Sequence, residues 1–163
     1  MKQRKICMLG TSSVGKTSLV RRFVQSVFSE KYHTTLGVKV DKKIVKSDGD
    51  PVCLMLWDIE GEDRFYRIKQ NYLRGLAGYL LVADGTRPVS LDAAIRLKSN
   101  MASAFRDTPH FLVLNKSDLH DQWCLQAADI KKIASAGFTV ISTSAKTGEN
   151  VEQVFTKLVE LIN

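Results

Sequence analysis

The segment from Gly10 to Thr17 reads Gly-Thr-Ser-Ser-Val-Gly-Lys-Thr, which has the residue types and spacing of a phosphate-binding loop. It matches the pattern GxxxxGK[ST] between an apolar run and a helix-like segment. The glycines let backbone N–H groups curl around phosphate oxygens, and the following helix adds its positive dipole end. Lys16 would bring a full charge to the outer phosphates, and the Thr17 hydroxyl would bind Mg²⁺. The pattern alone fits ATP as well as GTP.

A second polar loop, from Asp58 to Gly61, directly follows another apolar run. A carboxylate at the end of a strand can hold Mg²⁺ through water, which is the role expected of Asp58. The N–H of Gly61 can be offered to a terminal phosphate. Such a short DxxG pattern matches many ordinary turns, so it is weak evidence by itself. The predicted phosphate-binding residues are Gly10, Ser12, Ser13, Val14, Gly15, Lys16, Thr17, Ser18 and Gly61.

Two further loops have the chemistry to recognise a base. In Asn115-Lys116-Ser117-Asp118, the Asp118 carboxylate can accept two hydrogen bonds from the N1–H and 2-amino groups of guanine. Adenine offers neither group in that arrangement, and each unpaired buried polar group costs ~1–3 kcal/mol. The segment Ser144-Ala145-Lys146 can bring a backbone N–H to guanine O6. Each of these two segments alone is weak evidence.

The elements around these loops alternate between strands and helices. Short apolar runs at 5–9, 52–57, 77–83, 111–114 and 138–141 are typical of buried strands. Segment 38–46 alternates in polarity, which predicts a half-exposed antiparallel edge strand joined to 52–57 by a turn. Helices are expected at 18–25, 90–105, 127–136 and 151–162, the last with Asn150 as its N-cap. The pattern predicts a single α/β domain: a six-stranded, mostly parallel sheet with helices on both faces.

The overall composition is that of an ordinary intracellular globular domain. The chain has 163 residues with 44% hydrophobic and 25% charged residues, and it contains no apolar run long enough to span a membrane. The net charge of +7 is dispersed, and its densest segment, 39–46, is interpreted as solvated surface. The cysteines are expected to be reduced, with Cys7 and Cys53 in the core. We expect a cytoplasmic monomer that does not bind nucleic acid.

Taken together and in this order, the loops resemble those of the Ras superfamily of small GTPases, most closely its Rab branch. Besides the phosphate loop, the resemblance rests on Thr35-Leu-Gly-Val38, Trp57-Asp58, Arg64-Phe65 and Tyr72-Leu-Arg-Gly75. It covers essentially the whole chain. It implies one G domain over residues 1–163 that binds GTP and GDP with Mg²⁺ and acts as a molecular switch with slow hydrolysis.

The resemblance also assigns roles to individual residues. Thr35 is similar to the switch I threonine, which ligates Mg²⁺ and contacts the γ-phosphate only in the GTP state. Phe28 is similar to the aromatic residue that stacks edge-on against guanine, and Lys116 to the lysine that packs along the base. The implied metal ligands are Thr17, Thr35 and Asp58, and the implied catalytic residues are Lys16, Thr35, Gly61 and Glu62.

The same resemblance implies two switch segments, residues 28–38 and 59–75, ordered by the γ-phosphate and Mg²⁺. Effectors, exchange factors and activating proteins would bind these segments together with Trp57 and Tyr72. Val40 stands where Rab proteins usually have Phe, so particular Rab effectors do not carry over. Rab and Ras chains usually continue to prenylated cysteines, whereas this sequence ends at Asn163 with no such cysteine. We therefore expect membrane association only through a tail missing from this sequence or through a partner.

The clearest departure from the family is Glu62, which stands where these GTPases usually have Gln. A carboxylate can accept a proton from water, but it donates no amide N–H and places negative charge near the γ-phosphate. Hydrolysis would then be slow or would use an altered base; alternatively Glu62 points to solvent and a partner completes the chemistry. The main alternative function is a GTP-binding effector module with impaired hydrolysis. A P-loop ATPase or kinase is a more distant one, disfavoured by Asn115 and Asp118.

Overall fold

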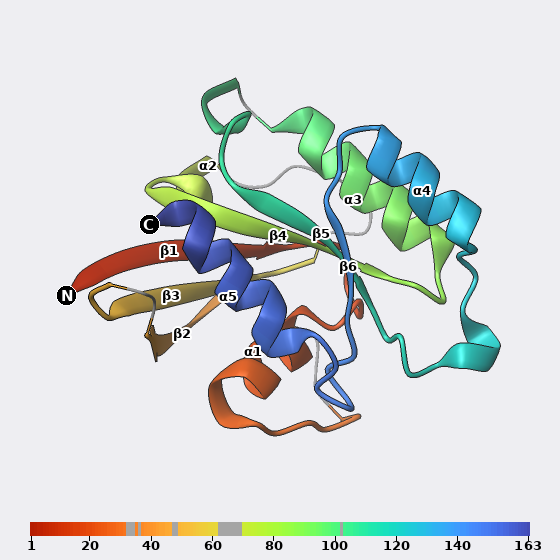
Figure 1. Ribbon diagram of the computed structural model, residues 1–163, viewed down its shortest axis with the longest axis horizontal. Helices are drawn as coiled ribbons and strands as arrows, with labels where there is room; N and C mark the ends of the chain where they lie inside the picture. The colour runs from red at the N-terminus through yellow and green to blue at the C-terminus, as the bar shows by residue number, and fades with distance from the viewer. Residues whose placement is uncertain (32–34, 36, 47–48, 62–69, 102) are drawn as a thin grey trace.

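The computed structural model describes residues 1–31, 35, 37–46, 49–61, 70–101 and 103–163 (Figure 1). Its centre is a six-stranded sheet in the order β2-β3-β1-β4-β5-β6. The β2–β3 pair is antiparallel and every other pair is parallel. The strands are β1 (Lys2–Leu9), β2 (Val38–Val45), β3 (Val52–Ile59), β4 (Leu76–Asp84), β5 (His110–Asn115) and β6 (Val140–Ser142). The predicted fold class is confirmed.

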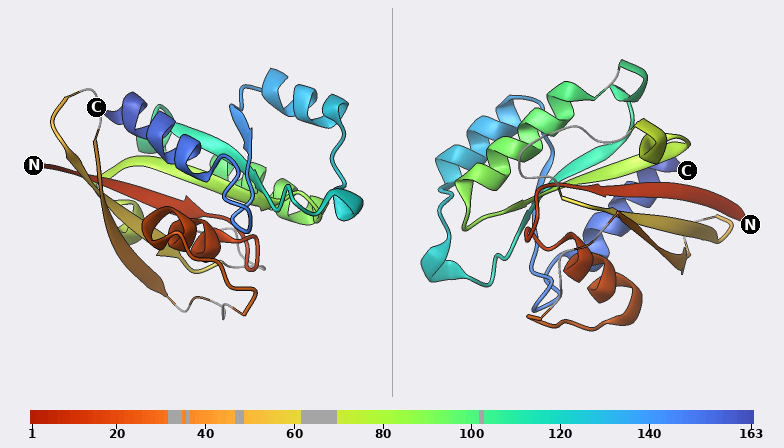
Figure 2. Two further views of the ribbon diagram at one scale, coloured as in Figure 1. Left: turned by 60° about the horizontal axis from the view of Figure 1, so that its bottom comes forward. Right: turned by 180° about the vertical axis from the view of Figure 1, so that it is seen from behind.

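Helices cover both faces of this sheet (Figures 1 and 2). The α-helices are α1 (Lys16–Gln25), α2 (Gln70–Leu73), α3 (Pro88–Asn100), α4 (Ala127–Ser135) and α5 (Val151–Ile162), and two 3-10 helices are η1 (Ser103–Phe105) and η2 (His120–Gln122). In β1, Ile6 and Met8 pack in the core beneath α1 and α5, whereas Cys7 and Leu9 pack in the core beneath α3. Because successive side chains of a strand point to opposite faces, a sheet covered twice needs the continuous apolar runs seen in the sequence.

The edge strand β2 is half exposed, as its alternation predicts. Its more apolar face is the solvent face, however, where Val40 and Ile44 are 39% and 58% exposed. The opposite face turns toward α1: Lys43 donates its ammonium hydrogen to the carbonyl of Phe23 and lies 3.9 Å from the centre of that ring. The long apolar stem of lysine can cover core residues while its charged end stays near water, so hydropathy alone does not decide which face is buried.

Several predicted boundaries differ from the structure. The helix predicted over 90–105 is α3 up to Asn100 and then the separate η1 turn. Asn150 directly precedes α5, as predicted for an N-cap, but its backbone is in the left-handed region and its side chain makes no capping hydrogen bond. Its Nδ2 instead donates to the carbonyl of Ser142, 2.8 Å away. The side chain therefore ties α5 to β6 instead of capping the helix. Part of the predicted turn, residues 47 and 48, lies outside the described residues.

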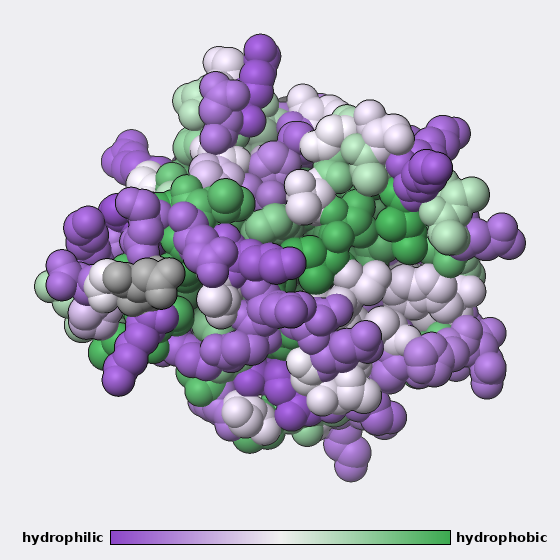
Figure 3. Space-filling view, in the orientation of Figure 1, coloured by the Kyte–Doolittle hydropathy of each residue, from purple (hydrophilic) through white to green (hydrophobic). Residues whose placement is uncertain are grey.

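The surface in the orientation of Figure 1 is mostly hydrophilic, with hydrophobic residues gathered around β6 (Figure 3). All three residues of β6 are half-buried, because this short strand lies at the edge of the sheet. Cys7 and Cys53 are buried, as predicted, and Cys124 is exposed; all three are free thiols. Among the helices of the described residues, none has the length and apolar character that crossing a membrane requires.

Candidate functional site

The loops that follow β1, β3, β5 and β6 meet around a cavity of about 350 Å³. Because the carboxyl ends of parallel strands share one edge of the sheet, residues far apart in sequence converge there. The predicted residues that line it are Ser12, Ser13, Gly15, Lys16, Thr17, Ser18, Phe28, Thr35, Gly61, Asn115, Lys116, Asp118, Ala145 and Lys146. Gly10, Val14, Asp58 and Ser144 are buried and do not form its wall. Glu62 lies outside the described residues.

The phosphate loop needs glycine at both ends for steric reasons. A Cβ on Gly10 would lie 2.4 Å from the carbonyl oxygen of Val82, and one on Gly15 would lie 2.2 Å from Nδ2 of Asn115. Gly15 also has φ of 102°, a left-handed value that side chains disfavour. The chain thus passes close to β4 and β5 while it turns into α1.

Lys16 is the buried positive charge of this loop. Its side chain is 6% exposed, and its ammonium group donates to the carbonyl oxygens of Gly10 and Thr11, both at 2.8 Å. Its position at the first turn of α1 puts the charge at the positive end of the helix dipole. Both features favour an anion in the cavity.

Three oxygen-bearing side chains meet beside the cavity: Thr17 and Thr35 line it, and Asp58 is buried next to them. The Thr17 hydroxyl donates to Oδ2 of Asp58 and lies 2.8 Å from the hydroxyl oxygen of Thr35. Thr35 Oγ1 is 3.4 Å from the same carboxylate oxygen. Burial raises the pKa of Asp58, and the hydrogen bond from Thr17 and the charge of Lys16 partly offset this. Oδ1 of Asp58 has no hydrogen-bond partner among the described residues.

These three side chains fit Mg²⁺, which prefers hard oxygen ligands and keeps several of its waters. Hydroxyl and carboxylate oxygens are the donors present, and the unpartnered oxygen of Asp58 can accept from a metal-bound water. The predicted metal set is therefore brought together although its members come from α1, the 26–37 connection and β3.

Gly61 lies against the phosphate loop. Ser12 Oγ donates to its carbonyl at 3.1 Å, and a Cβ on Gly61 would lie 2.4 Å from the backbone nitrogen of Ser12. Beside it, the Glu60 carboxylate accepts from the N–H of Gly37 at 3.0 Å, and Glu60 N–H donates back to Gly37 at 2.8 Å. Glu60 therefore joins the two predicted switch segments.

Asp118 is a further carboxylate in the cavity wall. Its Oδ1 accepts from Ser144 Oγ at 2.7 Å, and Ser144 Oγ accepts in turn from the N–H of Thr147 at 3.1 Å. Ser144, which was predicted to contact nucleotide, is fully buried and instead orients Asp118. The N–H of Ala145 donates to Asn115 Oδ1 at 3.2 Å, so Asn115 links this loop to β5.

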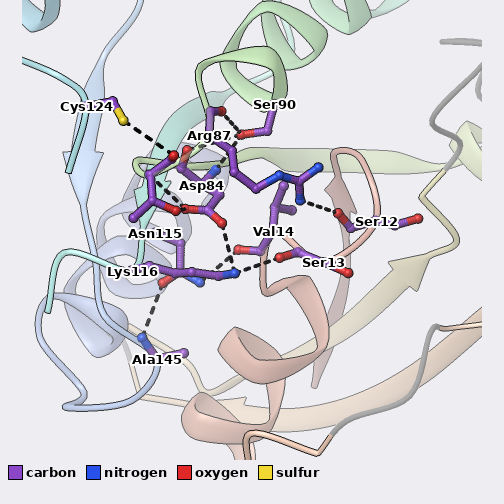
Figure 4. Close-up of polar contacts among 11 residues, drawn as sticks. Ser12, Ser13, Val14, Asp84, Arg87, Ser90, Asn115, Lys116, Cys124 and Ala145 are labelled. Carbon is purple, nitrogen blue, oxygen red and sulfur yellow. Dashed lines mark hydrogen bonds and ion pairs between the residues drawn. The ribbon is translucent and has the colours of Figure 1, made fainter. Parts of the chain in front are cut away.

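Asn115 and Lys116 connect the loop that carries Asp118 to the phosphate loop (Figure 4). Asn115 Nδ2 donates to the carbonyl of Val14 at 3.0 Å, and Lys116 Nζ donates to that of Ser13 at 2.9 Å. Lys116 also pairs with Asp84 at 2.9 Å. Burial alone would raise the pKa of Asp84, but hydrogen bonds from Thr86 and Lys116 outweigh it, so the pKa lies below its ordinary value. The pair keeps Lys116 fixed beside the cavity.

Sequence reasoning missed several residues in and around the cavity, among them Leu119 in its wall. Arg22 of α1 donates to the carbonyls of Ala145 and Lys146. Glu30 pairs with Lys146 at 3.1 Å and raises the pKa of that lysine. Two more are Asp84, the last residue of β4, and Arg87, in the loop that follows it. Only Asp84 had a usable signal, a carboxylate directly after the apolar run 77–83.

Comparisons with known proteins find relatives over nearly the whole chain. A sequence model of the Ras family matches residues 5–163. The chain is 35% identical to the Ras-related protein Rab-1 of Theileria annulata, over 97% of this chain and 73% of that protein. It is 36% identical to the Ras-related protein Rab-4 of Dictyostelium discoideum, over 97% of this chain and 78% of that protein. The Ras-related protein Rab-3D of Mus musculus is 34% identical, with coverages of 97% and 73%.

Proposed function

This chain belongs to the Ras family and is Rab-like, and from that premise we propose that it binds GTP and GDP with Mg²⁺ and hydrolyses GTP slowly. The observation that carries the proposal is that one cavity gathers the groups for a base, phosphates and a metal. Asp118, a guanine-type acceptor, lines it together with Lys16 of the phosphate loop. Thr17 and Thr35 also line it, and their hydroxyl groups meet the Asp58 carboxylate.

A switch function is supported by the two segments that supply Thr35 and Gly61 to the cavity wall. Thr35 belongs to one predicted switch segment and Gly61 to the other, and both line the cavity beside the phosphate loop. A γ-phosphate and Mg²⁺ bound there would hold both segments, and their release would follow hydrolysis. Residues 28–38 and 59–75, with Trp57 and Tyr72, are then the surface for effectors, exchange factors and activating proteins.

The proposal is tested first by nucleotide identity. Purified protein is denatured, and the released nucleotide is separated by ion-exchange chromatography. We expect GDP or GTP; release of ADP or ATP would favour the ATPase or kinase alternative. Single-turnover hydrolysis of GTP with Mg²⁺, and with EDTA as control, then separates a working GTPase from a GTP-binding effector module.

Thr17→Ala should weaken GTP binding about tenfold more than GDP binding, which corresponds to roughly 1.4 kcal/mol. The hydroxyl that ligates Mg²⁺ is lost, and the γ-phosphate depends more on the metal than the diphosphate does. Competition titrations with GTP and GDP in Mg²⁺ measure the difference. Thr17→Ser keeps the hydroxyl and should behave as the unmodified chain, and chelating Mg²⁺ should abolish the difference. Equal losses for both nucleotides would show that Thr17 only packs.

Glu62→Gln should raise intrinsic hydrolysis by up to about tenfold, because in the role proposed for this position a carboxylate would repel the phosphoryl oxygens and an amide would donate to them. Single-turnover rates measured between pH 5 and 9 provide the readout, with Glu160→Gln on the exposed end of α5 as a matched charge control. If Glu62 is instead a working base, the unmodified rate falls as the pH drops through its pKa and Glu62→Gln slows the reaction. An unchanged rate and pH profile would exclude both mechanisms.

A further inference from the structure

The loop after β4 is held by hydrogen bonds to the first turn of α3 and lies beside the phosphate loop. Arg87 N–H donates to the carbonyl of Asp84 at 2.9 Å, and Ser90 donates to the carbonyl of Arg87 through both its N–H (2.9 Å) and its hydroxyl (2.7 Å). Ser90 is 1% exposed, and its hydroxyl also accepts from the N–H of Asp84 at 2.9 Å. The backbone of Arg87 is therefore fixed on both sides.

From this position the Arg87 side chain extends to the phosphate loop, where Nη1 donates to the carbonyl of Ser12 at 3.2 Å (Figure 4). Lys116 holds the next carbonyl, that of Ser13, and Asn115 holds the one after it, that of Val14. Three successive carbonyls of the loop are thus bound by side chains from two other parts of the chain, the loop after β4 and the end of β5.

Holding a carbonyl also aims the N–H of the same peptide. In a planar trans peptide the C=O and N–H bonds point in opposite directions, and the described residues contain no cis peptide. Fixing the carbonyls of Ser12, Ser13 and Val14 therefore turns the N–H groups of Ser13, Val14 and Gly15 away from the three donors. Ser13 and Gly15 line the cavity. Where successive N–H groups of a loop point into one concavity, they form an anion-binding nest.

We propose that Arg87 is a positioning residue for the nucleotide phosphates, which it serves by holding the Ser12 carbonyl so that the Ser13 N–H faces the phosphate end of the cavity. Ser12, whose carbonyl Arg87 holds, also donates its hydroxyl hydrogen to the carbonyl of Gly61. Arg87 therefore acts on the phosphates near Gly61 and not on the base near Asp118. Its charge also polarises the Ser12–Ser13 peptide and strengthens that N–H as a donor. This inference rests on the proposed function.

The test compares Arg87→Ala, Arg87→Lys and the matched control Arg106→Ala, an exposed arginine at the far end of β5. The Arg87 side chain is exposed and makes no capping bond to α3, so the variants are expected to fold. Affinities for GMP, GDP and GTP are measured by competition against a fluorescent GDP. Arg87→Ala should weaken GDP and GTP about three- to tenfold, the size expected for one exposed charge-assisted hydrogen bond, and GMP less than twofold.

Arg87→Lys should recover most of the loss, because an ammonium can still donate to one carbonyl, and Arg106→Ala should match the unmodified chain. In the GDP complex, the amide proton resonance of Ser13 should move upfield in Arg87→Ala as its hydrogen bond lengthens. Equal losses for GMP, GDP and GTP, or no difference between Arg87→Ala and Arg106→Ala, would overturn the inference. If the chain binds adenine nucleotides instead, the guanine proposal fails, and the same comparison with AMP, ADP and ATP still decides the role of Arg87.

Discussion

Asp118→Asn is expected to weaken GDP binding on the order of 10²-fold or more. The carboxylate is oriented by Ser144, and it can accept from both the N1–H and 2-amino groups of guanine. A carboxamide keeps one acceptor and presents a donor to another donor, so one guanine group is left unpaired. Isothermal titration with GDP and GTP measures the loss.

The matched control for this change is Asp121→Asn, an exposed carboxylate in η2 that is not part of the cavity wall. It should leave GDP binding within about twofold of the unmodified chain. Xanthine carries an oxygen where guanine has its 2-amino group, so xanthosine diphosphate should bind Asp118→Asn better than the unmodified chain. Unchanged GDP affinity in Asp118→Asn would remove the basis for the guanine assignment.

Asn115→Ala is expected to lower the free energy of unfolding by about 2–4 kcal/mol and to accelerate nucleotide release. Asn115 is 2% exposed; Nδ2 donates to the Val14 carbonyl, and Oδ1 accepts from Thr143 Oγ1 at 3.1 Å and from Ala145 N–H. Alanine leaves all three partners buried without it. Urea denaturation and the release rate of fluorescent GDP provide the two measurements.

Asn100→Ala, at the exposed end of α3, is the control and should change the unfolding free energy by less than about 0.5 kcal/mol. Asn115→Asp separates the two halves of the amide: it keeps the acceptor for Ala145 but loses the donor to Val14 and adds a buried charge. Its loss should therefore be at least as large as that of Asn115→Ala. A stability close to that of the unmodified chain in both variants would show that Asn115 does not hold the three loops together.

Much of this molecule was predictable because its signals are local. The apolar runs 77–83 and 111–114 predict β4 and β5 since a strand covered on both faces has no polar side, and the spacing from Gly10 to Thr17 predicts a tight turn into a helix. The order of the polar loops after the strands then places Thr17, Asp58, Asn115 and Asp118 at one edge of the sheet. The boundaries were less predictable: α3 ends at Asn100, although the apolar residues Met101 and Phe105 beyond its end still pack against the core.

The sequence by itself therefore determined the α/β class, and it predicted the phosphate loop, Asp118 as the base acceptor and three oxygen-bearing side chains as metal ligands. Only the tertiary structure decided what holds those groups in place. Ser144 orients Asp118 from beneath, Glu60 ties two loops together, and Arg22 and Arg87 bind loop carbonyls from outside. The reason is physical. A binding motif is a local pattern in the sequence, whereas the donors that satisfy its backbone carbonyls come from distant segments. The spacing of residues along the chain does not predict which distant side chains will contact the motif.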